Sequence, residues 1–152
     1  MFRINRLSDY ALVLLARMAG ESKAHSARYW ATEAHLPEPT VRKLLKELSH
    51  AGMVSASRGP LGGYALARPA AAVSVADVLA VIEGPVSPTL CTANVGVGEA
   101  CTLQDRCPTM GAWHKVAGLL RGVLQRTTLA DLITAPKQTA PALAPAKVEA
   151  RP

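Results

Sequence analysis

The stretch Met53–Ala67 reads MVSASRGPLGGYALA, and it decides the fold. Two strand-like runs, 53–57 and 64–67, flank a turn rich in glycine and proline, and this pattern predicts an antiparallel β-hairpin. The turn starts with Arg58 and holds three glycines, Gly59, Gly62 and Gly63. A structural turn needs only one or two glycines. An arginine beside three of them favours an arm that inserts into a narrow groove, because glycine allows close backbone approach.

Three helices are predicted upstream of this hairpin. Apolar residues recur at helical spacing from Leu7 to Met18, and a second short helix is expected over 26–35. A third helix is predicted over 39–50, because proline suits the first turn of a helix and an Ala-Gly pair follows its end. Its apolar stripe consists of Val41, Leu44, Leu45 and Leu48. Helix, helix, turn, helix and hairpin is the order of a winged helix-turn-helix, a mainly α fold whose third helix enters the DNA major groove.

The solvent-facing side of the third helix is basic, and so is the start of the hairpin turn. Basic surface helices are common without any polyanion partner, so the helix alone leaves the question open. The hairpin shifts the balance towards DNA. The candidate DNA-binding residues are Pro39, Thr40, Arg42, Lys43, Lys46, Arg58 and Gly59.

The charge of the chain agrees with a polyanion partner for its first half. The net charge is +6 and the isoelectric point is about 9.6. Residues 1–68 hold ten Lys or Arg against five Asp or Glu, a net +5, whereas residues 69–152 have a net charge of only +1. The positive field therefore belongs to the predicted DNA-binding part.

All three cysteines lie in one Gly-rich, apolar-poor stretch, Leu90–Pro108, at Cys91, Cys101 and Cys107. An odd number of cysteines fits poorly with a secreted disulfide framework. Three thiols in a polar loop favour a soft metal centre over three buried thiols. Structural zinc sites usually contain close Cys-x2–4-Cys pairs, which this stretch lacks, so the spacing favours an iron–sulfur cluster and leaves zinc open.

Three thiolates leave a fourth coordination position to be filled. The nearest soft nitrogen is on His114, although a lone histidine near a helix start is more often a surface residue. Asp9, Glu99 and Asp105 are the oxygen candidates.

The chain divides into four predicted segments. Met110, Trp113, Ala117, Leu120 and Leu124 alternate steps of three and four, which is typical of a helix that packs on another helix, here in a twin subunit. The tail is rich in Ala, Pro and Lys without periodicity, and we expect it to be disordered. The segments are a winged-helix DNA-binding domain (1–84), a cysteine cluster-binding loop (85–108), a long dimerisation helix with a short final helix (109–134) and the tail (135–152).

Enzymatic and membrane roles find little support in the sequence. No Gly-rich phosphate loop follows a strand, and a Cys107–His114 nucleophile would leave two cysteines unexplained. The apolar run 11–16 is far shorter than the ~20 residues that a membrane helix needs. We therefore expect a cytoplasmic protein with no membrane partner and no small-molecule substrate.

Three segments resemble one known family. Leu7–Leu12 (LSDYAL), Pro39–Lys46 (PTVRKLLK) and Arg58–Leu66 (RGPLGGYAL) are similar to the IscR/NsrR-type (Rrf-two) family of winged-helix iron–sulfur transcription regulators. The resemblance covers about residues 1–133. The Pro-Thr-Val of the third helix and the Glu-Gly-Pro at 83–85 resemble most the branch that regulates the Suf iron–sulfur assembly operon.

This resemblance implies a homodimer that binds a near-palindromic promoter site in double-stranded DNA. It also implies a 2Fe–2S or 4Fe–4S cluster held by the three cysteines. The IscR branch has a histidine three residues after the last cysteine, where this chain has Met110. The NsrR branch can use an N-terminal aspartate from the other subunit, and Asp9 falls at that place. Asp9 therefore ranks above His114 as fourth ligand.

The expected function is a repressor that senses iron–sulfur status, redox stress or nitric oxide and controls iron–sulfur assembly genes. Two alternatives stay open. One is a winged-helix DNA-binding protein with a structural zinc site and no sensing role. The other is a thiol redox or electron-transfer protein.

Overall fold

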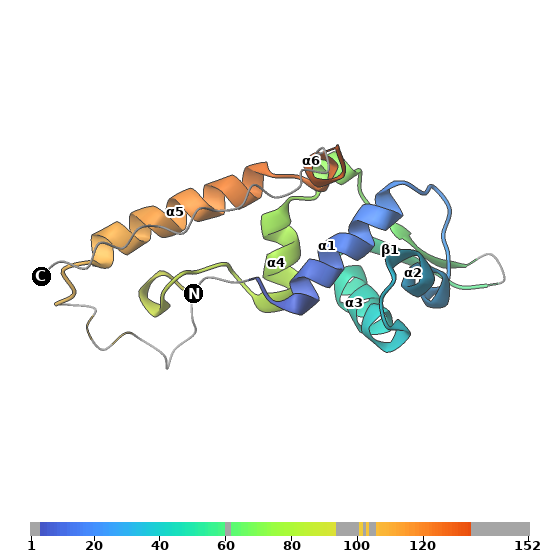
Figure 1. Cartoon of the computed structure of the whole chain (residues 1–152), viewed down its shortest axis with the longest axis horizontal. Helices are drawn as coiled ribbons and strands as arrows, with labels where there is room; N and C mark the ends of the chain where they lie inside the picture. The colour runs from blue at the N-terminus through green and yellow to red at the C-terminus, as the bar shows by residue number, and fades with distance from the viewer. Residues whose placement is uncertain (1–3, 60–61, 94–100, 102, 104–105, 135–152) are drawn as a thin grey trace, which may run out of the picture.

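The computed structural model describes residues 4–59, 62–93, 101, 103 and 106–134. It confirms the predicted winged helix-turn-helix (Figure 1). The expected disordered tail, 135–152, lies outside the described residues. In chain order the elements are α1 (Arg6–Ala19), α2 (Ala27–Ala34), α3 (Glu38–His50), β1 (Val54–Ser57), β2 (Gly63–Leu66), η1 (Ala70–Ala72), α4 (Val75–Glu83), η2 (Leu90–Thr92), α5 (Met110–Arg126) and α6 (Leu129–Thr134).

The core lies where α1, α2 and α3 meet, and it is built from the predicted apolar stripes. The buried side chains of α1 and α3 are Ala11, Leu14, Leu15 and Met18 from the first and Val41, Leu44, Leu45 and Leu48 from the second. Trp30 of α2 fills the space between them and is only 1% exposed. This packing fixes α3 with its opposite face towards solvent.

Local backbone chemistry sets the turn between α2 and α3. The Ser26 hydroxyl accepts a hydrogen bond from the Tyr29 N–H and so caps the start of α2, as predicted. At the end of α2, His35 adopts a left-handed conformation with φ of 54°. The Leu36 N–H then donates to the Ala31 carbonyl at 3.0 Å, which closes the helix end. The helix α3 begins at Glu38, one residue before the predicted start.

Tyr64 is one of the residues that fix the hairpin to the helical part of the chain. Strands β1 and β2 pair antiparallel with Val54 opposite Leu66. The Tyr64 N–H donates to the His25 carbonyl at 2.8 Å, and the Tyr64 carbonyl accepts from the His25 N–H at 3.1 Å. The indole N–H of Trp30 donates to that same carbonyl at 2.9 Å. The hairpin therefore moves with the helices as one unit.

A buried contact links the start of α1 to the end of α4. The Ser8 hydroxyl is fully buried and donates to the Glu83 carboxylate. The Asn5 N–H donates to the same oxygen at 3.0 Å. Glu83 is the last residue of α4, whose predicted capping box of Ser74 and Asp77 is confirmed. The cysteine-bearing segment thus follows a residue that is tied to the start of α1.

The long helix α5 extends away from the body and contacts α4 and η2 (Figure 1). Within the predicted seam, Ala117 is buried and Met110, Leu120 and Leu124 are half-buried, so part of this seam packs on the chain itself. A second apolar row is exposed by 40–64% and consists of Trp113, Val116, Leu119 and Val123. We call these four residues the outer row of α5. The predicted contact with a twin subunit stays a prediction.

After α5 the chain returns to the body. The Val75 N–H donates to the Thr127 carbonyl at 2.8 Å, and the Leu129 N–H donates to the Val73 carbonyl at 2.8 Å. The predicted capping box of Thr128 and Asp131 opens α6. Among the described residues, no helix combines the length and apolar character that a membrane crossing requires.

Candidate nucleic-acid interface and cysteine segment

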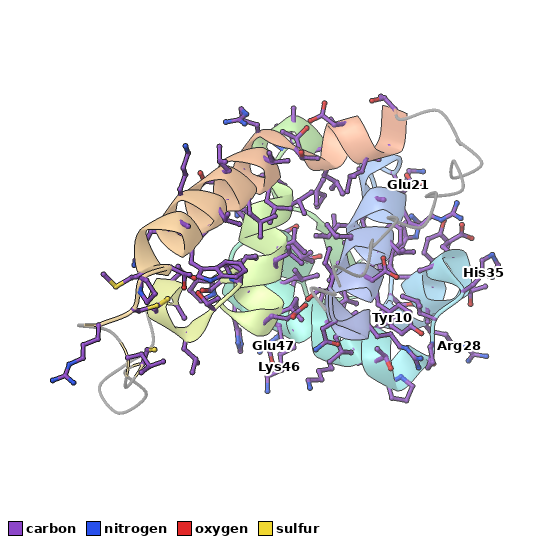
Figure 2. All side chains as sticks on the ribbon, turned by 60° about the vertical axis from the view of Figure 1, so that its left-hand side comes forward. Tyr10, Glu21, Arg28, His35, Lys46 and Glu47 are labelled. Carbon is purple, nitrogen blue, oxygen red and sulfur yellow. The ribbon has the colours of Figure 1, made fainter. Side chains whose placement is uncertain are left out.

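The outer face of α3 carries the predicted DNA-binding side chains. Pro39, Arg42, Lys43 and Lys46 are exposed, and Thr40 is half-buried. Because the opposite side of α3 is packed into the core, these side chains cannot turn inward. Figure 2 labels Lys46 on this helix. The fold thus presents a basic helix face to solvent.

One of these cations has a partner that the sequence reasoning missed. The Arg42 guanidinium contacts the Glu38 carboxylate, with Nε 3.0 Å and Nη2 2.5 Å from the same oxygen, Oε1. The spacing of four residues on one helix is the sequence signal that could have revealed the pair. Such exposed pairs stabilise a helix by only about 0.3–0.5 kcal/mol. The pair therefore matters for what Arg42 can bind more than for folding.

The hairpin turn keeps its arginine at the surface. Arg58 and Gly59 are exposed, and Gly59 has φ of +111°. A Cβ added to Gly62 would lie 2.5 Å from the Ser57 carbonyl oxygen, so the turn is compact only without a side chain there. Pro60 and Leu61 lie outside the described residues.

Three cations of this surface are available to a polyanion. Across the described residues, ion pairs join Arg42 with Glu38 and His25 with Glu21. Lys43, Lys46 and Arg58 have no such pair within the described part of the chain. Since α3 contacts β1, the basic side of α3 and the hairpin that carries Arg58 belong to one packed unit. This arrangement can neutralise phosphates and place an arginine against base edges.

The three cysteines are free thiols of intermediate exposure. Cys91 lies in η2 with its sulfur 3.2 Å from the Thr89 hydroxyl oxygen. The Cys107 sulfur lies 3.3 Å from the Thr109 hydroxyl oxygen, just before α5. The hydrogen bond from that hydroxyl, with backbone hydrogen bonds from Thr109 and Met110, lowers the pKa of the Cys107 thiol. Both sulfurs thus have a threonine hydroxyl beside them, and at Cys107 that hydroxyl favours the thiolate.

The chain by itself does not gather these thiols into one site. In the described part of the chain, no three His, Cys, Asp or Glu side chains lie close enough together to hold a metal ion. The donor chemistry nevertheless fits a soft metal or a cluster, since all three thiols are unpaired and accessible. Asp9 is exposed in the first turn of α1, and His114 is exposed on α5. Glu99 and Asp105 lie outside the described residues.

The cysteine segment lies away from the hairpin. Figure 1 shows η2 and the start of α5 at one end and the hairpin with α2 at the other, with α3 between them. Any effect of the cysteine segment on Arg58 must therefore pass through the helices of the body.

Residues 4–135 match the Rrf2 (Rrf-two) family, which is described as an iron-dependent transcriptional regulator. The HTH-type transcriptional regulator IscR of Escherichia coli is 32% identical over 93 residues, which are 61% of this chain and 55% of that protein. The chain thus spans about half the length of the curated relatives that it matches. These relatives are transcriptional regulators and not enzymes.

Two solved structures share the fold closely. CymR, the global cysteine regulator of B. subtilis, has a TM-score of 0.68 and 29% identity, with 90% of this chain and 99% of that chain covered. IscR of T. potens has a TM-score of 0.65 and 28% identity, with 87% of this chain and 86% of that chain covered.

Proposed function

This chain belongs to the Rrf2 family of transcriptional regulators, and from that premise we propose that it is a homodimeric, DNA-binding repressor that senses iron–sulfur status, redox stress or nitric oxide. The observation that carries DNA binding is the exposed basic face of α3 next to a hairpin that starts its turn with Arg58. The division into segments 1–84, 85–108 and 109–134 stays a prediction. Membership of the branch that regulates the Suf operon, and with it control of iron–sulfur assembly genes, also stays a prediction.

The proposed contact follows from the fold. The helix α3 enters the major groove of a near-palindromic site, and Arg58 reaches the neighbouring minor groove or backbone. The outer row of α5 supplies the apolar surface through which two copies join. Two copies present two α3 helices, so each half-site is bound by one subunit.

The experiment for DNA binding is fluorescence anisotropy at one salt concentration, with duplexes enriched from random DNA by the wild-type protein. We expect Arg42→Ala and Arg58→Ala each to weaken binding by about tenfold, within the 1–3 kcal/mol typical of such contacts. Arg121→Ala, on the exposed side of α5, is the matched control and keeps wild-type affinity. Equal affinity of all four proteins would remove the basis of the proposal.

Cys91, Cys101 and Cys107 would hold the cluster, with Asp9 of the second subunit ranked above His114 as fourth ligand. A bound iron–sulfur cluster supplies a group that responds to oxidants and nitric oxide. Bringing the three thiols together builds on the contact that η2 already makes with α5. Both segments connect to α4, whose Glu83 bonds Ser8 and Asn5 at the start of α1. The protein's own contacts thus offer a route from the cysteines to α1.

The cluster is tested by an anaerobic absorption spectrum with iron and sulfide analysis of the wild type and Cys101→Ala. We expect broad absorbance beyond about 400 nm in the wild type and its loss in the variant. A colourless protein with one zinc per chain would leave DNA binding intact and replace sensing by a structural metal site.

A second candidate function is a regulator that responds to a thiol metabolite without any cluster. Two observations favour it. The similar fold of CymR belongs to a global cysteine regulator, and the described residues do not gather three ligands. A colourless, metal-free protein whose DNA affinity changes on addition of cysteine would support this candidate.

A further inference from the structure

We infer that Glu38 is a positioning residue that sets the base specificity of this regulator by controlling what Arg42 can bind. The inference rests on the proposed DNA-binding function. It concerns a carboxylate at the start of a helix whose outer face carries Arg42, Lys43 and Lys46, and it assigns a role to the Glu38–Arg42 pair.

The geometry restricts one side of the arginine. Both Nε and Nη2 of Arg42 point to a single oxygen of Glu38, at 3.0 and 2.5 Å. These two nitrogens form one edge of the planar guanidinium group. The other edge, formed by Nη1 and Nη2, makes no side-chain hydrogen bond with the described residues. The pair therefore leaves one arginine edge available and occupies the other.

The available edge can bind a guanine base. Two parallel N–H donors match the O6 and N7 acceptors of guanine, which is the commonest specific arginine contact in the major groove. The side chain of Arg42 is 66% exposed, so this edge is accessible to DNA. Since Glu38 is one helical turn closer to the start of α3, it holds the guanidinium along the helix surface.

The carboxylate also opposes contact with the DNA backbone. A phosphate at the Nε–Nη2 edge would compete with Glu38, and a phosphate at either edge would be repelled by the negative charge of Glu38 more strongly than a neutral base would. Without Glu38, Arg42 is a free cation that can neutralise any phosphate, whatever the sequence. Glu38 thus weakens non-specific binding while it leaves the guanine contact possible.

Glu47 provides a matched control on the same helix. It is exposed, carries the same charge, and makes no ion pair with the described residues. Glu47→Ala and Glu38→Ala therefore remove the same charge from α3, but only Glu38→Ala frees Arg42. A difference between the two variants reports the pair and not the net charge.

The experiment selects duplexes from random 30-base-pair DNA with the full-length wild type and then measures two affinities for each protein. One is for the enriched duplex and the other is for a scrambled duplex. We expect Glu38→Ala to lower the ratio of specific to non-specific affinity about fivefold or more. The variant should also lose the preference for guanine at one position in each half-site. Glu47→Ala keeps the enriched motif and changes the ratio less than twofold.

The salt dependence gives a readout that a purely structural effect would not move. For the scrambled duplex, the slope of log affinity against log salt should steepen by about one phosphate contact in Glu38→Ala and not in Glu47→Ala. In an Arg42→Ala background, Glu38→Ala should change the ratio no further, because Glu38 acts through Arg42.

Two results would overturn the inference alone. These are equal specificity ratios for the Glu38 and Glu47 variants, and a full effect of Glu38→Ala in the absence of Arg42. If the wild type itself enriches no motif, the proposed DNA-binding function fails and this inference fails with it. The wild-type selection therefore separates the two failures.

Discussion

Gly63 shows how a single residue can decide the position of the hairpin. Its φ of +151° lies in a region that L side chains rarely adopt. A Cβ there would lie 2.4 Å from the His25 carbonyl oxygen, which is backbone and cannot move aside cheaply. Gly63 also precedes Tyr64, whose backbone N–H and carbonyl both form hydrogen bonds with the backbone of His25. The close approach of two backbones therefore requires glycine at this position.

We predict that Gly63→Ala destabilises the protein by about 2 kcal/mol or more, because strain and overlap add up. The measurement is the free energy of unfolding from urea denaturation. Gly118→Ala is the matched control, since nothing lies within 4 Å of its added Cβ on α5. In a helix interior this change should stabilise by about 0.5–1 kcal/mol. Changes of opposite sign in the free energy of unfolding for the two Gly→Ala variants would confirm that Gly63 is required by the backbone contact. Equal changes would contradict it.

Another decisive residue could not be found from the sequence. A serine is usually expected at the surface. Ser8 is nevertheless fully buried, because the carboxylate of Glu83, 75 residues further along the chain, accepts a hydrogen bond from its hydroxyl. The Glu38–Arg42 pair, in contrast, is recognisable from its spacing of four residues on one helix. The Ser8 contact depends on a partner whose proximity follows from packing and not from a motif.

At the scale of elements, caps and periodicity predicted most of the fold. The apolar stripes of α1 and α3 are buried as expected, and the capping boxes at Ser74 and Thr128 open α4 and α6. Which side of α5 packs on the rest of the chain could not be predicted as well, because the apolar residues of this helix lie on two of its sides. Periodicity identifies an apolar stripe but not whether the same chain or a second copy covers it.

The cap of α6 gives a prediction about pH. Hydrogen bonds from the Thr128 N–H and hydroxyl lower the pKa of Asp131. A carboxyl whose folded pKa lies below its unfolded value contributes stability above the ordinary Asp pKa of about 4. That contribution is lost as the pH falls through the folded pKa.

We therefore expect Asp131→Asn to lower the thermal unfolding midpoint at pH 7, and this difference from wild type should shrink steadily below about pH 4. The measurement is circular dichroism melting from pH 2 to pH 7. Glu33→Gln is the control, since Glu33 makes no hydrogen bond or ion pair within the described residues. A difference that stays constant with pH would show that the charge of Asp131 does not matter.

At the scale of the whole molecule, the outer row of α5 is the main surface that the fold leaves uncovered. Trp113, Val116, Leu119 and Val123 are exposed by 40–64% along one helix. Resting on the proposed homodimer, we predict that Leu119→Asp shifts the protein from dimer to monomer in analytical ultracentrifugation, because a charge would be buried between two copies. Gln125→Asp adds the same charge to another exposed position of α5 and should leave the dimer intact.

The cysteine site was predictable in its donors and not in its geometry. Composition alone singled out three thiols in one polar stretch. Their arrangement could not follow from spacing, because Cys91 lies in η2 and Cys107 just before α5, and tertiary packing sets how these two elements contact each other. The proposed role of Asp9 depends in addition on a second subunit.

The projection of α5 from the body has a mechanical consequence. Seventeen helical residues at about 1.5 Å each make a rigid arm of roughly 25 Å. The arm begins three residues after Cys107 and ends where Thr127 pairs with the body at Val75. A tilt of about 5° at one end displaces the other by about 2 Å, more than half of the ~3.4 Å rise per base pair along the axis of DNA. A helix of this length therefore turns a sub-ångström rearrangement at one end into a larger displacement at the other. In the proposed dimer, that displacement would change the spacing of the two α3 helices relative to the two half-sites on the DNA.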